Sequence, residues 1–296
     1  MFPSSFDYFR ASTVDEAVDL LAEHEDVDAE ILAGGHSLLP TMKSGLASPD
    51  VIIDIGAIED LSTIEIGDDS TRIGATTTYA DALNTSGFTD RQPDLADALR
   101  VLGDRQVRNA GTIGGNLAHA DPASDLPAVT VVADATMHIQ GPDGTRSIPA
   151  EEFFLTMYTT DLSEQDVLTA IEFPNIGSGD SAAYVKKSSP SSGYAMIGVA
   201  VRLAIDGGQI TGARVAANGA FDHPRRLSGV EALLTDSAVD AVDPESVGSA
   251  ATDGIEDWEY LDDMQVSSDF RAQLLTVYAS RAVEAAFDRL APAASP

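Results

Sequence analysis

The sequence predicts an α+β fold with two subdomains in its first 174 residues, followed by a smaller part built from one sheet and several helices. First, short apolar strands such as 51–55 alternate with short helices in the first part of the chain. Second, a polar, glycine-rich stretch at 175–181 interrupts this alternation and is typical of a linker. Third, an apolar run at 195–205 and an amphipathic segment at 269–290 follow the linker. The predicted boundaries are about 1–56 and 57–174 for the two subdomains and 182–290 for the C-terminal part.

Local signals indicate where the elements before the linker lie. The stretch 12–16 has the spacing of a capping box and predicts a helix that begins there. Strands at 64–66 and 71–75 flank an acidic turn, as in a β-hairpin. Phe153, Phe154 and Tyr158 are expected to pack in the core. The other expected elements are helices at 76–83, 94–102 and 125–132, a loop at 103–115, a hairpin over 137–148 and a strand at 167–173.

The C-terminal part is expected to hold a small antiparallel sheet with helices packed on it. Asp206-Gly207-Gly208 predicts a tight turn between the apolar run at 195–205 and a partner strand at 210–217. The stretch 184–187 and a Ser-rich loop precede this run, and helices are expected at 227–234, 245–252 and 269–290.

The charge of the chain excludes several classes of partner. Its formal net charge is -31, and only Lys43, Lys186 and Lys187 among its 17 basic residues are lysines. Such a surface repels nucleic acid and anionic membranes, so neither is an expected partner. The acidic residues are dispersed and lysines are few, which favours a source adapted to high salt, where charge repulsion is screened.

The absence of cysteine limits the chemistry of this chain. With no cysteine among 296 residues, it cannot hold an iron-sulfur cluster, a disulfide or a thiolate metal site. The five histidines show no paired ligand spacing, so no metal site is expected. Any redox chemistry would therefore depend on an organic cofactor. No apolar stretch is long enough to span a bilayer and no signal peptide is recognisable, which favours a soluble, cytoplasmic protein.

Two glycine-rich turns form the candidate binding site. The stretch 33–38 follows an apolar strand, and the stretch 111–116 repeats the combination of two glycines with a hydroxyl, just after Arg105 and Arg108. Such turns can present backbone N–H groups to a phosphate at close range, because glycine has no side chain and tolerates positive φ. A single Gly-Gly pair is more commonly a plain turn. A second copy favours a site for the two phosphates of a pyrophosphate.

The two turns match neither of the common nucleotide fingerprints, since the chain has no G-x-G-x-x-G between a strand and a helix and no Walker-type loop. Together with other short motifs they resemble the FAD-binding medium subunits of the molybdenum hydroxylases, the family of aerobic carbon monoxide dehydrogenase and xanthine dehydrogenase. The motifs that carry the resemblance are, in chain order, Phe6-Asp7-Tyr8, Ala33-Gly34-Gly35-His36-Ser37-Leu38, Thr112-Ile113-Gly114-Gly115-Asn116, Asp121-Pro122, Ser124-Asp125-Leu126-Pro127 and Ile171-Glu172-Phe173-Pro174.

The resemblance implies a fold and a cofactor. The fold is the two-subdomain FAD-binding type of the vanillyl-alcohol-oxidase (PCMH) group, followed by a small C-terminal domain, and the cofactor is FAD. In this reading the two turns hold the pyrophosphate and ribityl groups, Leu102 lines the adenine end and Leu168 packs on the cofactor. Lys186 approaches the isoalloxazine ring, and Tyr194 lies near it. The implied cofactor-binding residues are Ala33, Gly34, Gly35, His36, Ser37, Leu38, Leu102, Thr112, Gly114, Gly115, Asn116, Asp125, Leu168, Lys186 and Tyr194.

Asp125 has two possible roles. Its place before a predicted helix suits an N-cap, whose carboxylate accepts backbone N–H bonds. The resemblance implies instead that it binds the sugar hydroxyls of FAD. The loop at 188–193 departs from the family pattern, which has basic residues and a Gly-Asp pair there, so the way in which the flavin meets its acceptor is left open.

The resemblance also implies partners and a role. The chain would be the FAD-binding electron-transfer subunit of a hetero-oligomer that also contains an iron-sulfur small subunit and a molybdopterin large subunit. Electrons would pass from the iron-sulfur subunit through FAD to quinone, NAD or another acceptor. No nucleophile-base constellation is present, so a hydrolase is not expected and no catalytic side chain is assigned.

Two alternatives remain open at this stage. The chain could be a free-standing flavin oxidase or dehydrogenase of the vanillyl-alcohol-oxidase type, in which His36 would be the candidate for a covalent bond to the flavin. It could also be a scaffold protein with an empty site, which would take up no flavin.

Overall fold

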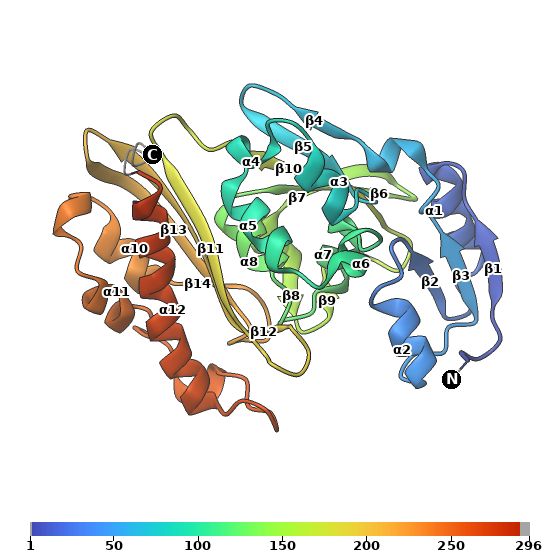
Figure 1. The fold of residues 1–296 in the computed structure, drawn as a ribbon. Helices are drawn as coiled ribbons and strands as arrows, with labels where there is room; N and C mark the ends of the chain where they lie inside the picture. The colour runs from blue at the N-terminus through green and yellow to red at the C-terminus, as the bar shows by residue number, and fades with distance from the viewer. Residues whose placement is uncertain (1, 291–296) are drawn as a thin grey trace.

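The computed structural model describes residues 2–290, and its three successive parts are each built around a sheet of their own (Figure 1). It contains both helices and strands in every part, as the α+β prediction requires. The boundaries predicted from the sequence for the two subdomains and the C-terminal part stay a prediction, and the parts are described below by their sheets.

The N-terminal part is a three-stranded parallel sheet with the order β1-β3-β2. The helix predicted at its start is present: Thr13 accepts the N–H of Glu16 at 3.1 Å, and the Glu16 carboxylate accepts the N–H of Ser12 at 2.7 Å. The central strand β3 is the most buried, and its apolar side chains pack with those of α1. The elements are β1 (Asp7–Arg10), α1 (Val14–Glu23), β2 (Ala29–Leu32), α2 (Leu38–Ser44) and β3 (Val51–Asp54).

The middle part holds a five-stranded antiparallel sheet with the order β4-β5-β10-β6-β7. Its helices cover the sheet and enclose fully buried side chains that include Phe88, Phe153 and Phe173. The elements are η1 (Glu59–Ser62), β4 (Ile64–Ile66), β5 (Ser70–Gly74), α3 (Tyr79–Asn84), α4 (Phe88–Arg91), α5 (Pro93–Val101), α6 (Arg105–Arg108), α7 (Ile113–His119), α8 (Leu126–Val132), β6 (Thr136–Gly141), β7 (Gly144–Pro149), α9 (Ala150–Phe153), β8 (Phe154–Thr156), β9 (Thr159–Thr160) and β10 (Val167–Pro174).

One prediction for this part was wrong. The stretch 103–115 is not a loop, because it contains α6 and the first residues of α7. The side chain of Thr112 caps α7 by accepting the N–H of Gly115 at 3.2 Å. The two glycines of the second turn thus lie in the first turn of a helix, a position in which the sequence favoured a break.

The C-terminal part is a four-stranded antiparallel sheet with the order β11-β12-β13-β14, and the long helix α12 packs along β11 and β12 (Figure 1). The strands β12 and β13 and the three longer helices lie within a few residues of the positions predicted. The elements are β11 (Ser181–Ser188), β12 (Ala195–Asp206), β13 (Gln209–Asn218), β14 (Arg225–Arg226), α10 (Ser228–Leu234), η2 (Val239–Ala241), α11 (Pro244–Ala250), η3 (Asp257–Glu259) and α12 (Ser268–Asp288).

The contact between the middle and C-terminal parts is electrostatically one-sided. Among residues 2–290, every ion pair that joins these parts places the cation on the C-terminal side and the carboxylate on the middle part. The pairs are Lys186–Asp125, Arg202–Asp94, Arg214–Asp134, Arg214–Glu151, Arg226–Glu151 and Arg289–Asp97. Lys186, Arg202, Arg214, Arg226 and Arg289, out of few basic residues in the chain, thus form ion pairs that join the two parts.

Arg202–Asp94 is one of the two deeply buried pairs, and Lys186–Asp125 is the other. Arg202 donates to both carboxylate oxygens of Asp94, at 2.7 and 2.9 Å, and also to the side chain of Gln92 and the carbonyl of Pro174. The Asp94 side chain is 0% exposed and that of Arg202 12%. Bidentate geometry and additional hydrogen bonds are what a buried pair needs to offset its loss of hydration.

Replacing Arg202 with Met should therefore destabilise the protein strongly, by about 3–5 kcal/mol, because it leaves the Asp94 carboxylate buried without its partner. The matched control is Arg214→Gln, which removes ion pairs with Asp134 and Glu151, whose side chains are 62% and 52% exposed. That change should cost about 0–1 kcal/mol. Urea denaturation followed by circular dichroism measures both values, and equal losses for the two variants would contradict this account.

Candidate functional site

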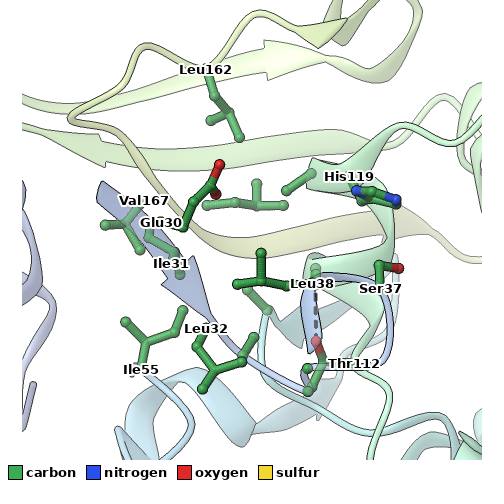
Figure 2. Close-up of a pocket in the computed structure, with 18 of the residues that line it drawn as sticks. Glu30, Ile31, Leu32, Ser37, Leu38, Ile55, Thr112, His119, Leu162 and Val167 are labelled. Atoms are coloured by element: carbon green, nitrogen blue, oxygen red, sulfur yellow. Dashed lines mark hydrogen bonds between the residues drawn. The ribbon is translucent and has the colours of Figure 1, made fainter. Parts of the chain in front are cut away.

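A cleft of about 670 Å³ lies where the N-terminal part meets the middle part (Figure 2). Three segments form its walls: β2 with the turn that follows it, the start and end of α7, and the segment from Tyr158 to Leu168. Both glycine-rich turns open into this one cleft. The volume falls within the range that is usual for sites of small ligands and cofactors.

Gly34 fixes the distance between the two turns. A Cβ atom at Gly34 would lie 2.3 Å from the carbonyl oxygen of Ala110 and 3.0 Å from the Cα of Gly111. Both neighbours are backbone atoms, so they cannot rotate away as a side chain would. The first turn can therefore approach the second this closely only with glycine at position 34.

The first turn offers a run of free backbone donors. Within the part of the chain that the structure describes, the N–H groups of residues 33 to 38 make no hydrogen bond, whereas the next, that of Leu39, is bonded to Gly35. Gly35 adopts φ +68°, a left-handed conformation that suits glycine and turns the chain from β2 toward α2. Consecutive N–H groups in such a turn form a concave site for an anion.

The second turn differs, because most of its backbone donors are already used. The N–H of Ile113 is bonded to Thr77, that of Gly114 to Ala75 at 2.8 Å, and that of Gly115 to the Thr112 hydroxyl. A Cβ at Gly114 would collide with the backbone of Ala75. Its glycines therefore serve close packing of α7 on the middle part, and the two turns are not equivalent anion sites.

Arginine and lysine are absent from the described residues that line the cleft. Arg108 donates instead to the carbonyls of Leu102 and Gly103, and Arg105 also lies outside the lining. The lining side chains that can carry a positive charge are three histidines, His24, His36 and His119. Negative charge on a ligand would thus meet amide dipoles and imidazoles and no permanent cation.

Several acidic residues line the cleft, namely Glu25, Asp28, Glu30, Glu164 and Asp166. Glu30 projects from β2 beside Ile31, and burial together with nearby Asp28 raises the pKa of its carboxyl group (Figure 2). At the same end, burial by itself would raise the pKa of Asp166, but hydrogen bonds from Arg146 and Ser163 outweigh burial and the pKa is lowered. This end of the cleft therefore disfavours a phosphate, which is consistent with the anion site being at the first turn.

Eleven of the fifteen predicted cofactor-binding residues line the cleft. These are Ala33, Gly34, Gly35, His36, Ser37, Leu38, Thr112, Gly114, Gly115, Asn116 and Leu168. Leu102, Asp125, Lys186 and Tyr194 are outside its lining. Leu102 is buried in the core of the middle part, and Tyr194 is partly exposed on the loop between β11 and β12.

Asp125 and Lys186 form a buried ion pair between the middle and C-terminal parts. Lys186 donates to one Asp125 oxygen at 2.7 Å and Tyr184 donates to the other at 2.6 Å, while the two charged side chains are 4% and 5% exposed. Burial raises the pKa of Asp125, opposed by Lys186 and Tyr184. The predicted N-cap role was wrong, because the Asp125 side chain makes no bond to the start of α8.

The cleft also contains residues to which no role was assigned from the sequence, among them Glu30, His119 and Leu162. Tyr158, expected to be a core or packing residue, lines the cleft as well: it is not in the core, since its side chain is 54% exposed, but it packs against His119. Tyr158 comes from a turn that folds back over α7, an arrangement that sequence periodicity does not reveal. The Asp121-Pro122 motif next to His119 was the nearest available signal.

Tyr158 and Ala120 are held in an unusual backbone conformation. Both adopt positive φ, 55° and 47°, and the N–H of Tyr158 donates to the carbonyl of Ala120 at 3.0 Å. For residues other than Gly, Asn or Asp this conformation costs about 1–2 kcal/mol each. Strain of this kind concentrates at functional sites.

Residues 2–290 contain neither a helix that could cross a membrane nor a metal-binding cluster. No helix there is long and apolar enough to cross a membrane. The same residues contain no cluster of three or more histidine, aspartate or glutamate side chains with the geometry of a metal site.

Comparison with known proteins agrees with the motifs and the geometry. Residues 4–176 match the family model "FAD binding domain in molybdopterin dehydrogenase", and residues 182–286 match "CO dehydrogenase flavoprotein C-terminal domain". The carbon monoxide dehydrogenase medium chain of Hydrogenophaga pseudoflava is 35% identical over 98% of this chain and 100% of its own. The glyceraldehyde dehydrogenase medium chain of Sulfolobus acidocaldarius is 36% identical over 78% of this chain and 81% of its own.

Solved structures give the same result. A chain of carbon monoxide dehydrogenase from Hydrogenophaga pseudoflava superposes with a TM-score of 0.92 at 36% identity, over 98% of this chain and 99% of that one. A chain of quinoline 2-oxidoreductase from Pseudomonas putida 86 superposes with a TM-score of 0.89 at 28% identity, over 98% and 99%. The chain therefore belongs to the family of FAD-binding medium subunits of the molybdenum hydroxylases, with the carbon monoxide dehydrogenase medium chains among its relatives.

Proposed function

We propose that this chain holds FAD non-covalently in the cleft and serves as the electron-transfer subunit of a molybdenum hydroxylase complex. The observation that carries the proposal is the run of unbonded N–H groups at residues 33 to 38, which face a cleft of suitable volume. Backbone N–H groups can neutralise a pyrophosphate in a chain that supplies no arginine or lysine to the site. When bound, FAD supplies the ability to accept two electrons and to release them singly or in pairs.

Different residues of the cleft bind different parts of the cofactor in this proposal. The amides of the first turn and the Ser37 hydroxyl hold the pyrophosphate, while Thr112 keeps the second turn folded against it. Leu38 and Leu168 provide apolar walls, which exclude water from the cofactor. Tyr194, which the family resemblance places near the isoalloxazine ring, lies outside the lining on the loop between β11 and β12.

Asp125 and Lys186 lie outside the lining and contribute to the site through the junction between the middle and C-terminal parts. Because each is already engaged by the other and by a third group, we assign them to fixing the C-terminal part, which carries Tyr194, against the middle part. Direct contact of these two residues with sugar hydroxyls or with the isoalloxazine ring, which the family resemblance implies, is a further part of the proposal.

The electron path extends beyond this chain. The chain contains no cysteine, so an iron-sulfur small subunit would supply electrons that a molybdopterin large subunit obtains from the substrate. The electrons would leave to quinone, NAD or another acceptor. The substrate is selected on the large subunit, and the predicted cytoplasmic location is part of the same proposal.

The test of this role is the composition of the native complex. An affinity-tagged copy of the chain, expressed in its source organism and purified in high salt, should carry FAD, iron, acid-labile sulfide and molybdenum in constant ratios. A chain that is purified with FAD but without iron and molybdenum would contradict the assembly and favour a free-standing flavoprotein.

Replacing Gly34 with Ala should abolish FAD binding, because the added Cβ would lie 2.3 Å from the Ala110 carbonyl and force the two turns apart. Gly45→Ala is the matched control: this glycine ends α2 at φ +79°, and a Cβ there would meet nothing within 4 Å. The control should lose about 1 kcal/mol of stability and keep its FAD. Quenching of flavin fluorescence measures binding, and circular dichroism checks the fold. Wild-type affinity in the Gly34 variant would refute the role given to this contact.

The alternative of a covalent flavin bond predicts a different result on denaturation. His36 is exposed in the first turn, so its side chain is accessible to such a bond. We expect acid precipitation to release all of the flavin into the supernatant. Flavin that stays with wild-type polypeptide but not with His36→Ala polypeptide would establish the alternative.

A further inference from the structure

His119 and Tyr158 form an aromatic pair in the wall of the cleft. His119 is the last residue of α7, and its ring centroid lies 5.3 Å from that of Tyr158, with the two planes at 53°. Both residues line the cleft, and Figure 2 shows the His119 ring at its edge, above Ser37. Within residues 2–290 the ring nitrogens of His119 have no hydrogen-bond partner, so they are available to a ligand.

The backbone holds this pair in place. Ala120, in its left-handed conformation, ends α7 directly after His119, and its carbonyl accepts the N–H of Tyr158, which is left-handed as well. Two strained residues that are bonded to each other thus set the positions of the two rings. Such strain persists where a site requires a particular orientation.

The positive charge of Lys186 is already balanced within the protein by Asp125. The ammonium group is already paired with Asp125 at 2.7 Å and bonded to the carbonyl of Gly193 at 3.1 Å, and its side chain is outside the lining. His36, which does line the cleft, is exposed, so solvent screens its charge. Two lining histidines are partly buried: His119 lies next to Tyr158 in the wall of the cleft, whereas His24 lies beside Phe9 at the end of α1.

We propose that His119 takes up a proton from solvent when the bound cofactor becomes more negative on reduction, and so serves as the local counter-charge of the site. This inference rests on the proposed binding of FAD. The two electrons come from the iron-sulfur partner named above, and the proton binds a ring nitrogen of His119 without any bond in the protein being broken. On reoxidation the proton returns to solvent.

The surroundings of His119 give the sign of the effect. Burial lowers the pKa of His119 and so favours the neutral ring, while Asp121 opposes this shift. Asp121 is the carboxylate that faces it from the loop after α7, and Tyr158 and Tyr194 are the other titratable groups on this side, while β10 contributes the apolar Leu168. Added negative charge in the cleft raises the pKa of His119, and the proton is bound at pH values between the oxidised-state and reduced-state pKa.

The experiment compares proton uptake in the FAD-loaded wild-type protein, His119→Gln and the control His138→Gln. His138 is a second partly buried histidine, on β6 outside the cleft, whose pKa burial also lowers. The dependence of the flavin midpoint potential on pH gives the number of protons taken up per two electrons. If the His119 pKa rises by about one unit, His119→Gln should take up at most about half a proton fewer than wild type at pH values close to that pKa, and the control should match wild type.

A second measurement needs no substitution. Proton NMR of the FAD-loaded wild-type protein, oxidised and then reduced by dithionite without oxygen, should show the His119 pKa shifted upward by about one unit or more on reduction. An unchanged His119 pKa, or equal proton uptake in all three proteins, would overturn the inference while the bound FAD still supports the proposed function. Loss of FAD from wild type on desalting would overturn the proposed function itself.

Discussion

The close contact of backbone with backbone at Gly34 is the constraint on which the site depends. It joins the N-terminal sheet to the middle part where both glycine turns meet, and it leaves no room for even one methyl group between Gly34 and Ala110. The first turn can therefore leave its N–H groups unbonded, because the contact with the second turn and the start of α2 hold it in shape. The second turn has the complementary task, since its own amides are bonded to Ala75 and Thr77.

The positions of the few cations explain why the cleft lacks them. A chain with a net charge of -31 might be expected to place its few cations at a pyrophosphate site. Arg202, Arg214, Arg226 and Arg289, together with Lys186, instead join the C-terminal part to the middle part through ion pairs with carboxylates such as Asp94 and Asp125. Anion binding is left to amide dipoles, which carry no net charge and need no side chain. The ion pairs therefore lie at the junction of the two parts, and the cleft has amide groups but no arginine or lysine in its described lining.

Much of the fold could be predicted from the sequence, because its signals are local. The capped helix at Thr13, the β4–β5 hairpin and the strands on either side of Gly207-Gly208 each depend on neighbouring residues. The glycine turns were recognised for the same reason. The helices α6 and α7, which begin within 103–115, were missed because the glycines there favoured a turn, although Asp104 and Thr112 cap these helices locally. The exposure of Tyr158 and the Asp125–Lys186 pair were missed because they join segments far apart in the chain, and no local pattern reports such contacts.

The central claim is that the cleft between the two glycine turns holds FAD without a covalent bond. The most direct test is the visible absorption spectrum of the purified wild-type chain, incubated with FAD in high salt and then desalted. We predict a perturbed flavin spectrum that corresponds to about one FAD per chain and reverts to that of free FAD on denaturation. A colourless protein after desalting, with its fold intact by circular dichroism, would contradict the claim.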